Sequence, residues 1–103
     1  MGLEAYLKRQ RAWSRKTFGP GRKVESICRH VEKELVEVRE EGALEEWVDV
    51  VILALDGALR TGASPREVCA ALEAKFQKNL RRRWPDWREV PKDQPIEHLK
   101  DES

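Results

Sequence analysis

Apolar residues recur along most of the chain at intervals of three and four positions, which is the spacing of one face of an α-helix. Glycine and proline interrupt this pattern at Gly19-Pro20-Gly21, Gly42, Gly62-Ala63-Ser64-Pro65 and Trp84-Pro85. The spacing predicts helices over about 3–15, 22–41, 44–61 and from 64 to just before Pro85. The β-branched run from Val48 to Ile52 lies inside the helical pattern, so we expect no strand and an all-α fold, a four-helix bundle.

The third segment, 44–61, is apolar on nearly every side. Its apolar residues are Trp47, Val48, Val50, Val51, Ile52, Leu53, Leu55, Ala58 and Leu59. A helix of this kind is normally buried. We therefore expect other helices or a second subunit to surround it, with Trp47 in the core. The first segment has few apolar residues, so we expect a peripheral helix.

The fourth segment has the clearest beginning. Ser64 is the expected N-cap, Pro65 the first helical residue and Glu67 the partner of Ser64 in a capping box. After this helix the chain is polar and interrupted by prolines, which predicts an extended C-terminal tail over about 86–103.

The length of 103 residues suits one domain over residues 1–103. A domain this small buries only a modest core, so we expect oligomerisation to complete the bundle. Net charge is +1, distributed as +6 over 1–23, −6 over 24–63, +4 over 64–83 and −3 over the last twenty residues. An acidic centre between basic flanks suits a metal-bridged anion. The alternative is a set of helices with solvated charged faces.

Other features argue against membrane and disulfide proteins. The longest apolar run, Val50 to Leu55, is too short to span a bilayer, and the N-terminal segment becomes basic at Lys8, unlike a signal peptide. We expect a cytoplasmic protein, in the host cytoplasm if a phage encodes it. Cys28 and Cys69 stand alone at apolar helix positions, which predicts buried free thiols.

Two pairs of acids have matching spacing on neighbouring helices. Glu34 and Glu37 border the apolar face of the second helix, and Glu46 and Asp49 share one side of the third. The short connection at Gly42 predicts antiparallel packing, which would let the two pairs face each other.

Four converging carboxylates repel one another unless cations bind them. Two Mg²⁺ ions would cancel the four charges, since Mg²⁺ prefers oxygen ligands, and two such ions can clamp a phosphate and activate a water. The alternative is surface acids in pairs such as Lys33 with Glu37.

A basic face is predicted on the fourth helix, where Lys75, Lys78, Asn79 and Arg82 follow one another at intervals of three or four. These side chains can neutralise the β- and γ-phosphates of a nucleotide and the departing pyrophosphate. The alternative is a solvated basic surface.

These residues carry a resemblance to a known family. Glu34-Leu-Val-Glu37 and Glu46-Trp-Val-Asp49 resemble the ExxE…ExxD signature of the MazG-like all-α NTP pyrophosphatase superfamily, which includes dimeric dUTPases and phosphoribosyl-ATP pyrophosphatase. Over roughly residues 13 to 98 the chain is similar to its dATP/dGTP diphosphohydrolase (MazZ-like) branch, known from phages and bacteria. The similar segments are Trp13-Ser14, Thr17-Phe18-Gly19, His30 to Glu37, Glu46 to Gly57, Lys78-Asn79, Arg82 and Trp84-Pro85-Asp86-Trp87.

The resemblance implies a reaction in which dNTP and water give dNMP and pyrophosphate by attack on the α-phosphorus. It implies that two or more Mg²⁺ or Mn²⁺ ions bind the acidic residues, that Glu34 or Glu37 orients or deprotonates the water, and that the basic residues contact phosphates. It further implies purine deoxynucleotide substrates and a homodimer or homotetramer. The metal ligands are Glu34, Glu37, Glu46 and Asp49, and the phosphate contacts are Lys78, Asn79 and Arg82.

The sequence allows two interpretations for each of three other residues. Trp13 and Phe18 stack on the base or pack the first helix, and His30 contacts phosphate or only pairs with Glu34. Asp56 is expected to be a structural hydrogen-bond acceptor, and His98 is expected to be solvated.

A nucleic-acid-binding protein is the alternative function. It would use the basic stretch 8–23 and the Arg81-Arg82-Arg83 segment, which Trp84 and Trp87 follow. The acids of the third helix argue against it, because DNA binding does not need them, so we expect no nucleic-acid partner.

Overall fold

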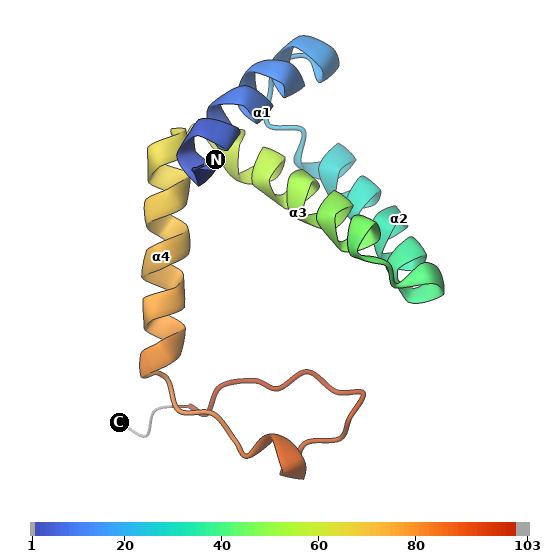
Figure 1. The fold of residues 1–103 in the computed structure, drawn as a ribbon, viewed down its shortest axis with the longest axis vertical. Helices are drawn as coiled ribbons and strands as arrows, with labels where there is room; N and C mark the ends of the chain where they lie inside the picture. The colour runs from blue at the N-terminus through green and yellow to red at the C-terminus, as the bar shows by residue number, and fades with distance from the viewer. Residues whose placement is uncertain (1, 101–103) are drawn as a thin grey trace. The chain divides into compact units, whose positions relative to one another are not determined.

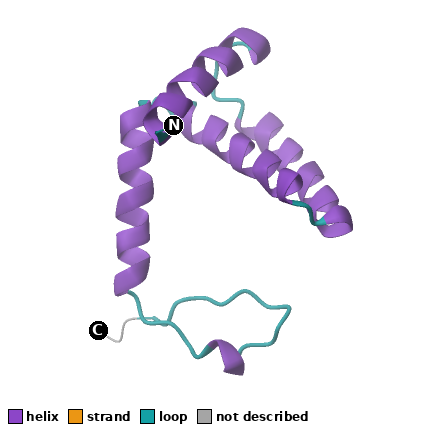
Figure 2. Ribbon diagram, viewed as in Figure 1, coloured by secondary structure: helices purple, strands orange, loops and turns teal. Residues whose placement is uncertain are grey.

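Four α-helices and one short 3-10 helix form the regular structure of residues 2–100 (Figure 1). In a computed structural model that describes residues 2–100, they are α1 (Leu3–Phe18), α2 (Val24–Glu41), α3 (Leu44–Leu59), α4 (Pro65–Arg81) and η1 (Trp87–Glu89). Figure 2 shows that helices and loops make up the described residues, with no strand among them, which confirms the all-α prediction. No helix in this described part combines the length and apolar character needed to cross a membrane.

Two compact units divide the chain, one ending at Ala70 and the other beginning at Ala71. The first contains α1, α2, α3 and the start of α4, and the second contains the rest of α4, η1 and the tail. The boundary falls inside a continuous helix. A single domain over residues 1–103 stays a prediction.

The pairing of α2 and α3 follows from the two residues between them. Gly42 adopts φ 65° and ψ 15°, a left-handed conformation that glycine enters without a Cβ clash. The carbonyl of Ala43 then accepts a hydrogen bond from the Glu46 amide at 3.1 Å, which begins α3. Figure 1 shows the two helices side by side and running in opposite directions, as the short connection predicted.

The small core of the first unit joins α1, the end of α3 and the start of α4. Leu7 is 0% exposed and Leu59 1%, and Val68 is buried against them. The peripheral position predicted for the first helix is therefore wrong. Gln10 and Ser14 of α1 are also buried, because polar groups of α3 bind them.

The beginning of α4 is the capping box that the sequence predicted. The Glu67 amide donates to Ser64 Oγ, and the Ser64 amide donates to Glu67 Oε1, both at 3.1 Å. These bonds satisfy amides that the helix itself leaves without acceptors. They also lower the pKa of Glu67, because they favour its ionised form.

The apolar surface of α3 is only partly covered. Trp47 and Val51 are each 53% exposed, so the other helices of the described chain do not surround α3. The core position predicted for Trp47 is wrong for the described chain, since α1 and α2 pack on other sides of the helix. Burial by a second subunit stays a prediction. Cys28 is exposed and Cys69 half-buried, so the predicted burial of Cys28 is also wrong here, while both thiols are free.

The tail of the second unit returns toward the end of α4. Asp86 caps η1 by accepting from the Arg88 amide at 3.0 Å. Farther along, the Leu99 amide donates to the Arg83 carbonyl at 2.8 Å, which closes the segment between them into a loop.

Candidate functional site

The carboxylate of Glu34 is largely buried, with only 12% of its side chain exposed. Its Oε1 lies 3.2 Å from Nε2 of His30, one turn earlier on α2, so His30 pairs with it as one interpretation expected. Its Oε2 is buried and receives no hydrogen bond from the described residues. An unpaired buried carboxylate oxygen costs free energy, so this atom is suited to bind a cation or a proton.

Glu37 lies one turn after Glu34 and interacts with it directly. The pKa of Glu37 is raised, first by a hydrogen bond with the Glu34 carboxyl and then by the negative charge of Glu34. Two ionised carboxylates have only acceptors, so that bond needs a proton on one of them. The raised pKa of Glu37 therefore comes mainly from the neighbouring acid Glu34.

Glu46 is the corresponding group near the beginning of α3. Its pKa is raised to about 7, first by a hydrogen bond with Glu41, the last residue of α2, and then by burial. The charges of Glu41, Glu45 and Asp49 raise it further. Glu41 therefore joins the acidic set across the turn, although the sequence interpretation did not include it among the ligands.

The four predicted metal ligands interact as two groups on the α2–α3 hairpin. Among residues 2–100, no three His, Cys, Asp or Glu side chains are arranged closely enough to hold a metal ion. The donors nevertheless fit a hard divalent cation: carboxylate oxygens are what Mg²⁺ and Mn²⁺ prefer, and each group contains an acid whose pKa is raised, first by a hydrogen bond with a neighbouring acid. Their joint role as ligands stays a prediction.

A groove of about 520 Å³ between α1 and α3 borders Asp49. Trp13 lines this groove and is 55% exposed. The Gln10 amide is fixed beside it, since Nε2 donates to the Ile52 carbonyl at 2.9 Å and Oε1 accepts from the Tyr6 hydroxyl. A flat ring system can stack on the indole while its polar edge meets the amide and the phenol.

Phe18 lines a different cavity, of about 180 Å³, together with His30. The rings of Trp13 and Phe18 meet edge to face, with centroids 5.3 Å apart and planes at 89°. The two aromatic residues singled out for base stacking therefore border separate cavities. Phe18 supports the Trp13 ring from the side.

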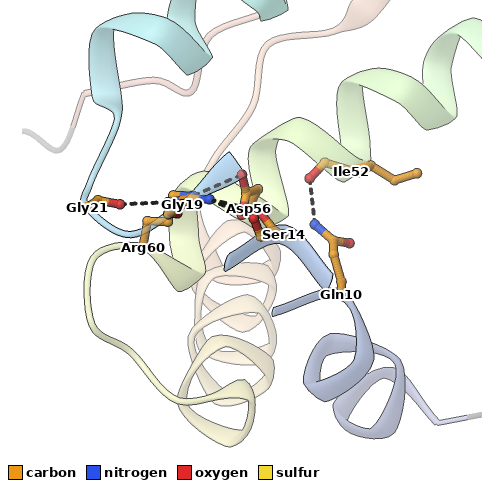
Figure 3. Close-up of polar contacts among 7 residues, drawn as sticks. All are labelled: Gln10, Ser14, Gly19, Gly21, Ile52, Asp56 and Arg60. Atoms are coloured by element: carbon orange, nitrogen blue, oxygen red, sulfur yellow. Dashed lines mark hydrogen bonds and ion pairs between the residues drawn. The ribbon is translucent and has the colours of Figure 1, made fainter. Parts of the chain in front are cut away.

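A buried guanidinium fixes how α1 lies against α3, as Figure 3 shows. The side chain of Arg60 is 3% exposed and donates to Asp56 Oδ2 at 3.1 Å and to Ser14 Oγ at 2.9 Å. It also donates to the carbonyls of Gly19 at 3.0 Å and Gly21 at 2.8 Å. Ser14 in turn donates to Asp56 Oδ1 at 2.7 Å.

This network holds the α1 side of the groove in place. Asp56 is the structural acceptor that the sequence predicted, but Arg60 was not identified from the sequence. Its signal was available, since Arg60 follows Asp56 by four residues at the end of α3. Its partners in α1 and the following loop are distant in sequence and could not be found from local spacing.

The predicted basic face belongs to the second unit. Lys75, Lys78 and Asn79 lie on α4, and Arg82 follows its last residue. Arg82 Nη1 donates to Asn79 Oδ1 at 3.1 Å. Lys78 and Arg82 line a common cavity, whereas Lys75 is exposed and does not line it. Their contacts with phosphate stay a prediction.

We compared the chain with known protein families, and one family model matches it. Residues 6–102, nearly the whole chain, match the family model described as dATP/dGTP pyrophosphohydrolase. Searches of curated proteins and of solved structures gave no match.

Proposed function

The chain belongs to the dATP/dGTP pyrophosphohydrolase family and is a nucleotide pyrophosphohydrolase, and we propose that it cleaves purine deoxynucleoside triphosphates with divalent cations bound by its acidic residues. In the proposed reaction, a water oxygen forms a bond to the α-phosphorus. The bond from that phosphorus to the bridging oxygen breaks, and pyrophosphate leaves with the electron pair. The acids are Glu34, Glu37, Glu46 and Asp49.

The buried Oε2 of Glu34 is the observation that carries this proposal. A carboxylate oxygen without a donor, next to a second acid of raised pKa, is costly in the chain alone. A divalent cation would remove that cost. When bound, Mg²⁺ or Mn²⁺, two or more per site, supplies positive charge that offsets the phosphates and makes water more acidic.

Glu34 and Glu37 are the two candidates for accepting the proton of the attacking water. The pKa of Glu37 is raised, first by its hydrogen bond with Glu34 and then by the charge of Glu34. A general base must lie within hydrogen-bonding reach of the water that it activates. We therefore propose that one of these two residues accepts the proton of the attacking water, without choosing between them.

Trp13 is the proposed stacking residue for the base. The groove beside it is bordered by Asp49, so a base on Trp13 lies near an acid of the cation-binding set. Purine rings offer a larger stacking area than pyrimidines, and the dATP/dGTP specificity of the family requires a purine subsite. Phe18 supports this ring and is not proposed to stack on the base.

Lys75, Lys78, Asn79 and Arg82 are the proposed partners of the phosphates. Lysine and arginine donors are suited to phosphate oxygens, and Asn79 orients Arg82 through its side-chain oxygen. His30 pairs with Glu34, and we propose that its main role is to position that carboxylate. A contact between His30 and phosphate would be a secondary role.

A homo-oligomer, dimer or tetramer, is part of the proposal. Trp47 and Val51 on α3 and Phe76 on α4 are each more than half exposed in the single chain. Large apolar side chains at this exposure are the usual content of a subunit interface.

Pyrophosphate release from dATP, dGTP, dCTP, dTTP and dUTP, each with Mg²⁺ and with a chelator, tests the proposal. We expect release from dATP and dGTP only, and only with the cation. The Glu34→Gln variant should lose about 100-fold or more in rate, the order contributed by a positioned base or metal ligand.

Glu40→Gln is the matched control, because Glu40 is exposed on the same helix. It should keep the wild-type rate. Equal activity of Glu34→Gln and wild type would contradict the assignment of the acids as cation ligands. Cleavage of dUTP or dCTP would contradict the purine specificity but not the proposed pyrophosphate-releasing reaction.

A further inference from the structure

A cavity of about 480 Å³ in the second unit is lined by Lys78, Arg81, Arg82 and His98. No carboxylate is among these lining residues, and none of the ion pairs found within residues 2–100 involves any of the four. Three cations around one space repel one another unless an anion binds there. The cavity therefore has the chemistry of an anion site.

His98 reaches this cavity because the tail folds back on α4. The Leu99 amide donates to the Arg83 carbonyl at 2.8 Å. The His98 ring meets Trp84 edge to face, with centroids 6.0 Å apart, and Trp84 Nε1 donates to the Asn79 carbonyl at 2.9 Å. These contacts hold an imidazole from the far end of the tail next to the cations of the helix end.

A simpler explanation for the cations at this cavity is that they complement the dipole of α4. Lys78 and Arg81 lie in the last turn of α4, where positive charge is favourable. That account does not require a histidine to return from the tail. An imidazole adds an N–H donor to the cavity, which helps to bind an anion and does nothing for the dipole.

We propose that His98 is a further phosphate-binding residue, which with Arg81 completes a pyrophosphate subsite within the second unit. This inference rests on the proposed function for the identity of the anion. The imidazole N–H and the guanidinium groups donate to phosphate oxygens, and Asn79 fixes Arg82 for the same purpose.

Product inhibition of the full-length enzyme tests this subsite, because pyrophosphate contains the β- and γ-phosphates and dAMP contains neither. In His98→Ala, we expect the inhibition constant of pyrophosphate and the KM for dATP to rise about tenfold, as for the loss of one hydrogen bond to a charged group. The inhibition constant of dAMP should not change, and kcat should stay within about twofold.

His98→Phe separates binding from a purely structural role. Phenylalanine keeps an aromatic ring against Trp84 but has no N–H donor. We expect it to weaken pyrophosphate binding as much as alanine does. Wild-type inhibition in His98→Phe would mean that the ring only holds the tail, which overturns the proposal. Lys100→Ala is the control, since Lys100 lies on the same tail but lines a neighbouring cavity.

Direct titration of inorganic pyrophosphate into wild type and His98→Ala, with a chelator present, keeps this inference separate from the proposed function. Weaker binding in the variant supports the subsite even if the wild type hydrolyses nothing. Equal binding overturns the subsite even if hydrolysis is normal. A fall in single-stranded DNA affinity with unchanged pyrophosphate binding would also overturn it, because the cations would then serve nucleic acid.

Discussion

Arg60 and Asp56 form an ion pair at the end of α3, with Nε 3.1 Å from Oδ2. The same guanidinium donates to two carbonyls of the loop between α1 and α2, and Asp56 also accepts from Ser14 of α1. The pair therefore ties three segments together through a group that is nearly inaccessible to water. The pair contributes to the stability of the fold because its partner groups would lose hydrogen bonds if it were removed.

Arg60→Ala should lower the free energy of unfolding by about 3 kcal/mol, because it leaves Asp56 buried without its cation and two loop carbonyls without their donor. Urea denaturation followed by far-UV circular dichroism measures this. Arg29→Ala is the control, since Arg29 pairs with Glu25 in the open, at 77% and 78% exposure. It should hardly change stability. Equal effects of the two variants would contradict the role given to Arg60.

Ser64→Ala should cost about 1 kcal/mol by removing the cap of α4. The Glu67 partner adds a pH dependence. Its folded pKa lies below the ordinary 4.5, so its contribution is present above pH 4.5 and is lost as pH falls through the folded value. The stability difference between wild type and Glu67→Gln should therefore shrink in acid. A difference that stays constant from pH 7 to pH 3 would contradict the capping box.

Glu46 should make the metal-free chain less stable as pH rises from 4.5 to about 7, because its folded pKa is raised and the folded state gives up that proton reluctantly. Thermal unfolding at pH 5 and pH 8 should show this loss in wild type and not in Glu46→Gln. Mg²⁺ should restore stability at pH 8 in wild type only. The same Mg²⁺ response in Glu46→Gln would remove Glu46 from the ligand set.

Trp13→Ala should raise the KM for dATP and dGTP about tenfold, in line with the loss of one base–aromatic stack, and leave kcat close to wild type. Trp87→Ala is a matched control, since Trp87 is 67% exposed in η1 and does not line the groove. Steady-state rates over a range of dNTP concentrations measure both. An unchanged KM in Trp13→Ala would return Trp13 to a packing role.

Local signals in the sequence predicted the helices and their ends. The αL stop at Gly42 and the capping box of Ser64 and Glu67 depend on residues within four positions, and the structure has both. The interaction between Glu34 and Glu37 could also be predicted from the sequence, because one helical turn separates them.

Long-range contacts are where the sequence interpretation fell short. The burial of Gln10 and Ser14 depends on Ile52 and Asp56, each 42 residues later, so α1 looked peripheral from its own composition. The exposure of Trp47 could not be inferred either, since an apolar helix surface does not say whether the same chain or another copy covers it.

The carbonyl of Gly21 is bound by a residue that the ribosome adds 39 positions later. While the chain is being synthesised, α2 and α3 can pair as soon as α3 has emerged, because only two residues separate them. The loop after α1 has no donor for its carbonyls until Arg60 is made. Helix α1, although synthesised before α2 and α3, therefore cannot complete its docking on α3 until the residue at the end of α3 has been added.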